Sequence, residues 1–328
     1  MKTLLQSTQA YQIIKTEGRE RRFSHTYLLL FDDARNLRSA LKTFAKIFFD
    51  CDGEYYGEQD ADKKRIANLI DNENFSDCLF FPEDGKTMKK EDAEKIHEES
   101  TLAPVEGSKK LFVISDFAEA NTVTQNKLLK LLEEPPAGVY FLLGATTSYS
   151  VLQTVLSRAK KLEILSFGVD ETADCLARIY GNKYDRSILS LCAAASGGNL
   201  GQAQGMLEGG HYKTLLENAF SLVLCQSYQL PTIVKQLGEF KQQKELIAMF
   251  RLVFRDALVV KTQGKKAGRN LLMKTEVSRI EQVAERYSLP ALFTAQEVLS
   301  DAEKQVKFNA VFSQCIELCI AKIQSKNN

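Results

Sequence analysis

The segment between residues 31 and 39 raises the first chemical question, because it follows an apolar run and precedes a helical pattern. Nucleotide-binding proteins place a phosphate loop there. Such a loop needs glycines that let the backbone wrap the phosphates, a lysine for their charges and a Ser or Thr for Mg²⁺. This segment contains no glycine, its two aspartates would repel a triphosphate, and Leu37 and Arg38 stand where the lysine and the hydroxyl would be. We therefore expect a degenerate loop that does not cradle ATP, formed by Asp32, Asp33, Asn36, Leu37 and Arg38.

Two adjacent acids, Glu133 and Glu134, resemble a pair of catalytic carboxylates at first sight. They end a helical pattern directly before Pro135-Pro136. Adjacent residues of a helix point about 100° apart, so these carboxylates do not form an acid–base pair. We expect them to act at the helix end or at an interface.

The first half of the sequence supplies the elements that position these residues. Four short β-rich runs stand out, and three of them are nearly continuously apolar, which is typical of strands buried on both faces of a parallel sheet. The four runs are 27–31, 110–115, 139–146 and 162–165.

Helical patterns alternate with these runs. They cover 36–49 and 121–134, and the second shows a capping box from Thr122 to Gln125 and a stop at Pro135. Alternation of strands and helices predicts an α/β domain over residues 1–165.

The pattern changes after residue 166, where no further convincing strand occurs. Short helices are predicted over 170–180, 184–195 and 201–207, and longer amphipathic helices over 211–325. We expect a small helical domain over 166–208 and an all-helical domain over 209–328.

Composition narrows the class of protein. The 328 residues are 44% hydrophobic and 26% charged, with no apolar run of membrane-spanning length, and the first residues turn polar too soon for a secretory signal. The seven cysteines are dispersed, which fits a reduced compartment better than a disulfide scaffold. We therefore expect a cytoplasmic protein.

The net charge of +1 is the sum of two unlike parts. Residues 1–210 carry a net −5 and residues 211–328 a net +6. The acidic excess lies in 50–100, with 16 acidic against 7 basic residues, and favours a solvated insert there. The basic part is compatible with a solvated surface or with contact to an anionic partner such as DNA.

Several stretches between residues 23 and 205 resemble the motifs of the AAA+ clamp-loader family, in the family's order and spacing. The most specific is Gln125–Pro136, QNKLLKLLEEPP, which is close to the family's QNALLKTLEEPP. Leu156–Ala159, LSRA, is similar to the family's LSRC. The other matching stretches are 23–28, 44–46, 141–147 and 198–203.

The resemblance implies an α/β AAA+ module with a parallel sheet flanked by helices over 1–165, a helical lid domain over 166–208 and an all-α collar domain over 209–328. The sequence departs from the family at the nucleotide site. The run at 110–115 is followed by the single acid Asp116, a remnant of the Walker B pair, and Gln202 replaces the sensor-2 arginine. We expect no ATP hydrolysis at the chain's own site.

The family's zinc module is also incomplete. Structural zinc needs four Cys or His ligands. Only Cys51 stands at the expected start, Cys78 follows too far along the chain, and His97 has no matching ligand in the sequence. We expect no metal and no cofactor.

Ser157 and Arg158 are the candidate catalytic residues. From position alone, Arg158 would be an ordinary surface or salt-bridged arginine. The resemblance instead implies an arginine finger, which neutralises charge on the γ-phosphate of an ATP bound to a neighbouring subunit. Ala159 replaces the family's cysteine behind it.

The implied function is that of a non-catalytic clamp-loader subunit, a stator in a pentameric ring. Its implied partners are ATPase subunits of the gamma/tau type and a delta subunit, with the sliding clamp and primer–template DNA reached through the complex, and no membrane. Two alternatives stay open: a degenerate paralogue that serves only as a protein-interaction scaffold, and a free-standing ATP-driven remodeller, which the glycine-free loop disfavours.

Overall fold

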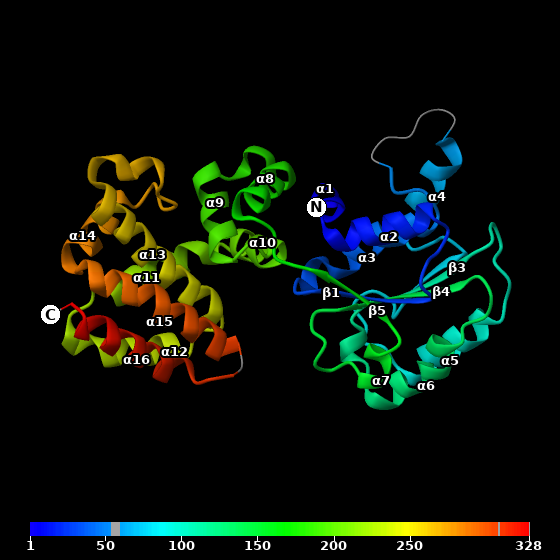
Figure 1. Cartoon of the computed structure of the whole chain (residues 1–328). Coiled ribbons are helices and arrows are strands. Elements are labelled where there is room, and N and C mark those ends of the chain that lie inside the picture. The colour runs from blue at the N-terminus through cyan, green and yellow to red at the C-terminus, as the bar shows by residue number, and fades with distance from the viewer. Residues whose placement is uncertain (54–59, 308, 328) are drawn as a thin grey trace. The chain divides into compact units, whose positions relative to one another are not determined.

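The computed structural model describes residues 1–53, 60–307 and 309–327 of the chain. The chain forms two compact units, Met1–Ser166 and Phe167–Asn328. The first unit carries the sheet, and the described part of the second is helical (Figure 1). The predicted boundary at 208/209 falls inside the second unit and stays a prediction.

The sheet of the first unit has five parallel strands in the order β2-β3-β4-β1-β5. All four predicted strands are present within a few residues of the predicted bounds, and the predicted fold class is confirmed. Their apolar runs lie where a parallel sheet is covered on both faces, and β3 is buried throughout. The strands are β1 Thr26–Phe31, β2 Cys78–Phe81, β3 Lys110–Ile114, β4 Val139–Ala145 and β5 Lys160–Ile164.

Helices cover both faces of this sheet (Figure 1). On one face α3 packs closely against β4, because a Cβ at Gly144 would meet Leu41 Cδ1 at 2.7 Å. On the other face α5 and α6 pack on Phe112 and Phe141 in one apolar cluster. The helices of this unit are α1 Lys2–Gln6, α2 Gln9–Arg19, α3 Ala34–Phe48, α4 Ala61–Asp71, α5 Lys90–Ser100, α6 Thr122–Glu133 and α7 Gln153–Leu156, with the 3-10 turn η2 Phe117–Glu119.

The expectation of a solvated insert over 50–100 is wrong for the described residues 60–100. This stretch supplies α4, the edge strand β2 and α5, and it buries Ile70, Cys78 and Ile96. The strand is only four residues long and is surrounded by acids, so its apolar run was too short to stand out. Residues 54–59 lie outside the described residues.

The predicted capping box at the start of α6 is also wrong. Asn121 caps the helix, and its Oδ1 accepts a hydrogen bond from Thr124 N at 2.9 Å. Gln125 is buried instead. Its Nε2 donates to the carbonyls of Ala120 and Ser150, and its Oε1 accepts from Leu152 N, each at 2.9 Å. Gln125 therefore ties α6 to the loop before α7.

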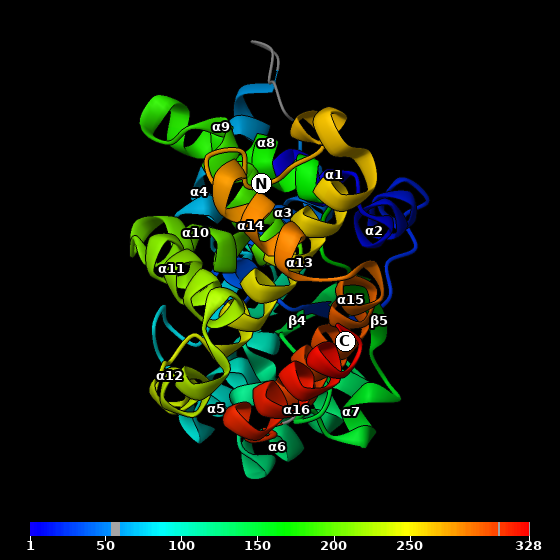
Figure 2. The same cartoon turned by 90° about the vertical axis from the view of Figure 1, so that its left-hand side faces the viewer.

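The second unit is built from helices joined by short turns. Figure 2 shows α13, α15 and α16, of which α15 packs against both of the others. The carboxylate of Asp256, fully buried in α13, accepts hydrogen bonds from the backbone N–H groups of Leu272 and Met273. The helices are α8 Val169–Tyr180, α9 Arg186–Ala195, α10 Leu200–Glu208, α11 His211–Leu224, α12 Leu230–Gly238, α13 Gln243–Gln263, α14 Val277–Arg286, α15 Leu289–Lys307 and α16 Phe312–Ser325, with the 3-10 turns η3 Gly181–Lys183, η4 Ser227–Gln229 and η5 Gly264–Arg269.

None of the helices in the described ranges is both long enough and apolar enough to cross a lipid bilayer.

Replacing Gln125 by Ala should lower the free energy of unfolding by about 2–4 kcal/mol, because two carbonyls and one N–H lose their partner inside the protein. Asn126→Ala is the matched control, since Asn126 is exposed on the same helix. Urea unfolding of the full chain measures both variants. Equal stability of the two variants would contradict this role of Gln125.

Candidate functional site

The loop after β1 ends in a helix whose first turn is already capped by an internal carboxylate. Asp33, only 3% exposed, is the N-cap of α3. Its Oδ1 accepts from Asn36 N at 3.1 Å and its Oδ2 from Asn36 Nδ2 at 2.8 Å. A helix N-terminus is the place where a phosphate binds in nucleotide sites. Here the Asp33 carboxylate takes that place.

The remaining loop residues divide between solvent and core. Asp32 is exposed, whereas Leu37 is 2% exposed and packs in the core. A buried leucine at the position of a phosphate-loop lysine offers no charge to a nucleotide. Leu37 therefore gives the loop no positive charge.

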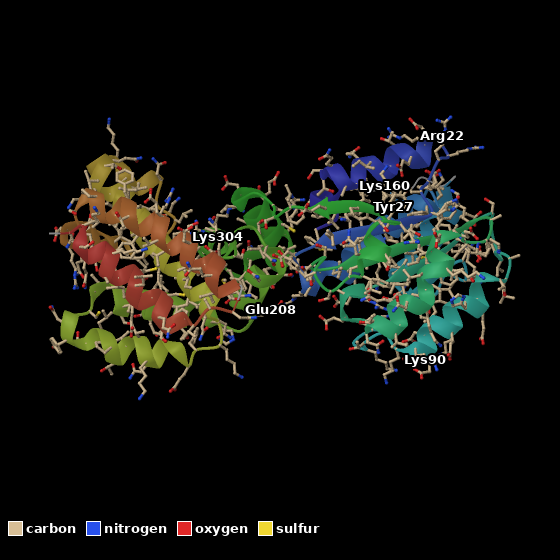
Figure 3. The ribbon with its side chains drawn as sticks, turned by 60° about the horizontal axis from the view of Figure 1, so that its bottom comes forward. Arg22, Tyr27, Lys90, Lys160, Glu208 and Lys304 are labelled. Atoms are coloured by element: carbon tan, nitrogen blue, oxygen red, sulfur yellow. The ribbon has the colours of Figure 1, made fainter. Side chains whose placement is uncertain are left out.

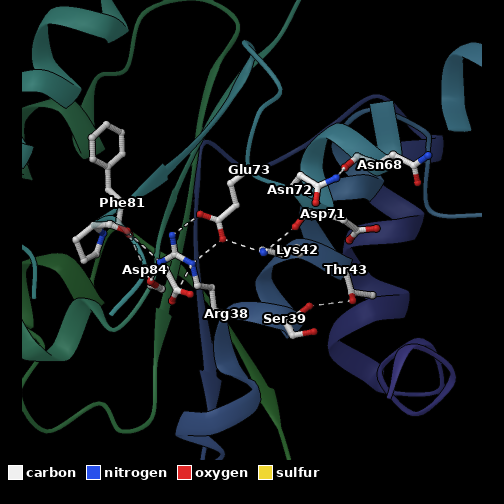
Figure 4. A network of polar contacts seen from close by, with 12 residues as sticks. Arg38, Ser39, Lys42, Thr43, Asn68, Asp71, Asn72, Glu73, Phe81 and Asp84 are labelled. Carbon is white, nitrogen blue, oxygen red and sulfur yellow. Dashed lines mark hydrogen bonds and ion pairs between the residues drawn. The ribbon is translucent and has the colours of Figure 1, made fainter. Parts of the chain in front are cut away.

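Arg38 points away from the loop and into a network that links α3 to the edge of the sheet (Figure 4). Its guanidinium forms a fork on Glu73, with Nε–Oε1 at 2.7 Å and Nη2–Oε2 at 2.5 Å. Its Nη1 donates to Ser115 Oγ at 2.8 Å and to the carbonyl O of Pro82 at 3.0 Å. The side chain is 16% exposed, so these internal acceptors use most of its donors.

Glu73 holds this network together from the end of α4. Lys42 Nζ lies 2.9 Å from Glu73 Oε1. Burial alone would raise the pKa of Glu73, but the hydrogen bonds from Arg38 and Lys42 and their positive charges outweigh it, so the pKa is lowered. Glu73 is therefore a carboxylate that is ionised and paired within the fold.

Asp116, which the resemblance assigns as a Walker B remnant, follows β3 and Ser115. It has left-handed backbone angles, with φ of 51°. Burial, with a smaller contribution from Glu119, raises its pKa. Ser115 thus contacts Arg38 just beyond the carboxyl end of β3. The next residue, Asp116, is a single acid, whereas a Walker B motif has a pair of acids there.

Arg158 lies at the amino ends of the strands, whereas the loop with Asp33 follows the carboxyl end of β1. Because β1 and β5 are parallel and Tyr27 pairs with Lys160, Arg158 sits near the start of both strands. Asp33 comes after the end of β1, and the four residue steps from Tyr27 to Phe31 alone span about 13 Å. Tyr27 and Lys160, which mark the start of the two strands, are labelled in Figure 3. Arg158 cannot reach the chain's own loop without a rearrangement of the sheet.

The guanidinium of Arg158 is held by three acceptors and stays partly open. Its Nη1 donates to the carbonyl O of Thr154 at 2.8 Å and to Ser157 Oγ at 3.4 Å, and its Nη2 donates to Glu133 Oε1 at 3.0 Å. The side chain is 31% exposed, and that of Glu133 is 53% exposed. Ser157 is the C-cap residue of α7. An exposed ion pair of this kind is weak and can exchange its carboxylate for another anion.

Glu133 is a residue of this site that the sequence reasoning assigned only to a helix end or an interface. It is the last residue of α6, and Thr26 Oγ1 donates to the carbonyl O of Leu132 beside it at 3.3 Å. The sequence signal for the pair was present, since the LEEPP and SR motifs both belong to the resemblance, but nothing in the spacing showed that they touch. Glu134 is exposed and is the C-cap of the helix.

Cys51, Cys78 and His97, the residues that the incomplete zinc module would draw on, do not come together as a ligand set. Among the residues that the structure describes, no group of three or more His, Cys, Asp or Glu side chains is placed to hold a metal ion. Burial raises the pKa of Cys51 to about 12, opposed by the charge of Lys46, and burial also raises that of Cys78. The Nε2 of His97 lies 2.8 Å from the carbonyl O of Lys127. In α10, Gln202 N donates to Asn199 Oδ1 at 2.9 Å, which caps that helix.

Residues 6–167 match the profile of the family described as DNA polymerase III, delta subunit. DNA polymerase III subunit delta' of Bacillus subtilis is 30% identical over 141 residues, which cover 43% of this chain and 42% of that protein. DNA polymerase III subunit gamma of Buchnera aphidicola is 27% identical over 145 residues, 43% of this chain and 39% of that protein. Subunit tau of B. subtilis is 23% identical over 329 residues, 93% of this chain and 58% of that protein.

The matches thus span less than two thirds of the length of these relatives. Among solved structures, a gamma subunit-related protein of Thermotoga maritima aligns with a TM-score of 0.40 at 15% identity, covering 96% of this chain and 99% of that chain. The clamp loader delta protein of B. subtilis aligns with a TM-score of 0.34 at 14% identity, covering 95% and 98%.

Arg38→Met should destabilise the chain by about 2 kcal/mol near pH 7, because Glu73 loses its fork while remaining largely buried. Since the folded pKa of Glu73 is lowered, the folded state binds fewer protons, and the pair contributes fully above the unfolded pKa of about 4.3. The difference between wild type and variant should therefore shrink as the pH falls toward 3.

Denaturant titrations at several pH values measure this difference. Arg65→Met is the matched control, because Arg65 pairs with Glu106 on the surface and should cost much less. A difference that does not change with pH would contradict the assignment to Glu73.

Proposed function

We propose that this chain, whose residues 6–167 match the profile of the DNA polymerase III delta family, acts as a clamp-loader subunit of the delta-prime type. In this function it is a stator that does not hydrolyse ATP and completes the ATP site of a neighbouring subunit. The single observation that carries the proposal is the position of Arg158 at the amino ends of β1 and β5, while its own loop follows the carboxyl end of β1. An arginine at this position cannot reach a nucleotide bound to the loop of its own chain.

The chemistry required of Arg158 is the neutralisation of charge on a γ-phosphate supplied by the neighbour. A guanidinium offers two parallel N–H donors to phosphate oxygens and is always charged. Thr154 and Ser157 hold one nitrogen, while the nitrogen bound to Glu133 becomes available when a phosphate replaces that carboxylate. Ser157 thus positions the arginine, and Arg158 is the catalytic residue in trans.

The loop after β1 supports the other half of the proposal. Asp33 fills the helix N-terminus and Arg38 is engaged with Glu73 and Ser115, so a triphosphate would meet a carboxylate there and would have to compete for Arg38. The same features disfavour a free-standing ATP-driven remodeller. We propose that the chain needs neither ATP at its own site nor zinc.

The proposed partners are gamma/tau-type ATPase subunits and a delta subunit, with the sliding clamp and primer–template DNA handled by the complex in the cytoplasm. Residues 166–208 would act as the lid domain and residues 209–328 as the collar domain. Failure to join a ring with these subunits would favour a paralogue that serves only as a protein-interaction scaffold.

Arg158→Ala should leave assembly intact and lower turnover at the completed ATP site by about 10³-fold or more. The ATPase of the reconstituted ring, stimulated by clamp and DNA, should therefore fall to the activity of its remaining sites. Arg158→Lys should fall similarly, because lysine keeps the charge but not the fork. Size-exclusion chromatography checks assembly, and a phosphate-release assay checks turnover.

Lys161→Ala is the matched control, because Lys161 is an exposed cation three residues further along the chain. It should retain full activity. Wild-type ATPase in an assembled Arg158→Ala ring would overturn the finger role.

A further inference from the structure

A cavity of about 550 Å³ lies in the first unit between the end of α2 and the starts of β3 and β4. Its lining includes Arg19, Arg21, Phe23, Lys109 and Tyr140. The volume falls within the range of small-molecule sites. The cavity lies at the amino ends of the strands, whereas the degenerate loop follows their carboxyl ends, so it is separate from the nucleotide site of the fold.

Positive charge dominates the cavity. Among the described residues, neither Arg19 nor Arg21 has an ion-pair partner. Lys15 also lines the cavity but is paired with Asp52 at 2.6 Å. Among the described residues of the lining, the carboxylate is that of Asp50, which lies 3.0 Å from Lys63 Nζ, so part of its charge is already balanced.

Lys109 adds a third cation. Its Nζ donates to the carbonyl O of Phe48 at 2.9 Å and lies 4.9 Å from the ring centroid of Phe23. Burial lowers the pKa of Lys109; the charge of Asp50 opposes this and that of Arg21 adds to it. An anion between Lys109 and Arg21 would offset both the desolvation and the repulsion.

Arg21 adopts a strained backbone conformation that points to a use for its side chain. Helix α2 ends in a Schellman motif, in which Arg22 N donates to the Glu17 carbonyl and Arg21 N to the Gly18 carbonyl. Arg21 occupies the left-handed position of this motif, with φ of 56°, where glycine is the usual residue. A side chain there costs free energy, and such residues cluster at binding sites.

The ring of Phe23 in the cavity lining is not available for stacking with a nucleobase. Phe23 stacks on Phe48 at 4.4 Å between ring centroids and also lies beneath the ammonium of Lys109. Its ring is thus in use within the protein and does not offer a platform for a nucleobase. Recognition in this cavity depends on charge.

We propose that this cavity is a phosphate-binding site in which Arg19, Arg21 and Lys109 hold the phosphate groups of the ligand. Arginine forks match phosphate oxygens, and three cations that line one cavity suit a polyanionic group better than a single carboxylate. The groups can come from a free pyrophosphate-type ligand or from a nucleic-acid backbone, which present the same chemistry to the site.

Isothermal titration of the full chain with pyrophosphate tests the site without any partner subunit, so its result is independent of the finger role of Arg158. Arg19→Gln and Lys109→Gln should each weaken binding about tenfold. Arg21→Gly should weaken it about tenfold and also raise the thermal unfolding midpoint, because glycine relieves the left-handed strain. A residue with a purely structural role would not show this opposite pair of effects.

Arg22→Gln is the matched control. Arg22 lies next to Arg21 at the end of α2, does not line the cavity and is labelled in Figure 3. It should bind pyrophosphate within twofold of wild type. Equal losses for Arg22→Gln and Arg21→Gly would indicate a diffuse basic surface and overturn the site, as would no pyrophosphate binding at millimolar concentration.

A competition arm separates the two sources of phosphate. If a single-stranded oligothymidylate displaces pyrophosphate from wild type, and Arg21→Gly lowers its affinity, the site takes a nucleic-acid backbone. If the oligonucleotide does not displace pyrophosphate, the site takes a free phosphate ligand. Both outcomes support a phosphate site at these three cations.

Discussion

The parallel pairing of β1 with β4 and β5 is the constraint on which the rest of the first unit depends. It places the loop with Asp33 at the carboxyl ends of the strands and Arg158 at their amino ends. Glu17 reinforces the start of this pairing, since it accepts from both Tyr27 and Lys160. Thr26 fixes the end of α6 at the same level. Glu133 and Arg158 therefore meet because two elements are anchored to the beginning of one strand.

The same sheet explains how the loop after β1 keeps its fold without a bound phosphate. A phosphate normally satisfies the N–H groups at the start of the helix and draws cations toward it. In this chain Asp33 and Asn36 satisfy that turn internally, and Glu73 draws Arg38 sideways to the edge strand. The edge is itself built from the acidic stretch after α3. Glu73, which lies in a stretch that looks like a solvated acidic surface in the sequence, thus binds Arg38 inside the protein where a bound anion would otherwise do so.

The sequence predicted those parts that depend on long, regular patterns. The strands β1, β3 and β4 are apolar over five to seven residues, so burial on both faces could be predicted. The strand β2 has four residues and takes its stability from its neighbours, so it left no comparable signal. Gln125 fitted a local capping pattern, but its side chain makes long-range hydrogen bonds instead. Its partners Ser150 and Leu152 lie 25 and 27 residues away in the sequence. Which carboxylate meets which arginine depends on such long-range contacts and could not be predicted from spacing.

Three arginines of the first unit show how the supply of internal acceptors decides the role of a cation. Arg38 has a carboxylate fork and two further acceptors and is largely buried, so it serves the fold. Arg158 has one exposed carboxylate and is partly open, so a phosphate can compete for it.

Arg21 has no carboxylate partner among the described residues and is held in a strained turn beside a cavity, so an external anion has no ion pair of Arg21 to displace there. Availability to a phosphate therefore rises from Arg38 to Arg158 to Arg21. In the proposed function a phosphate of the neighbouring subunit binds the second of these, whereas the third is open to a ligand in the isolated chain.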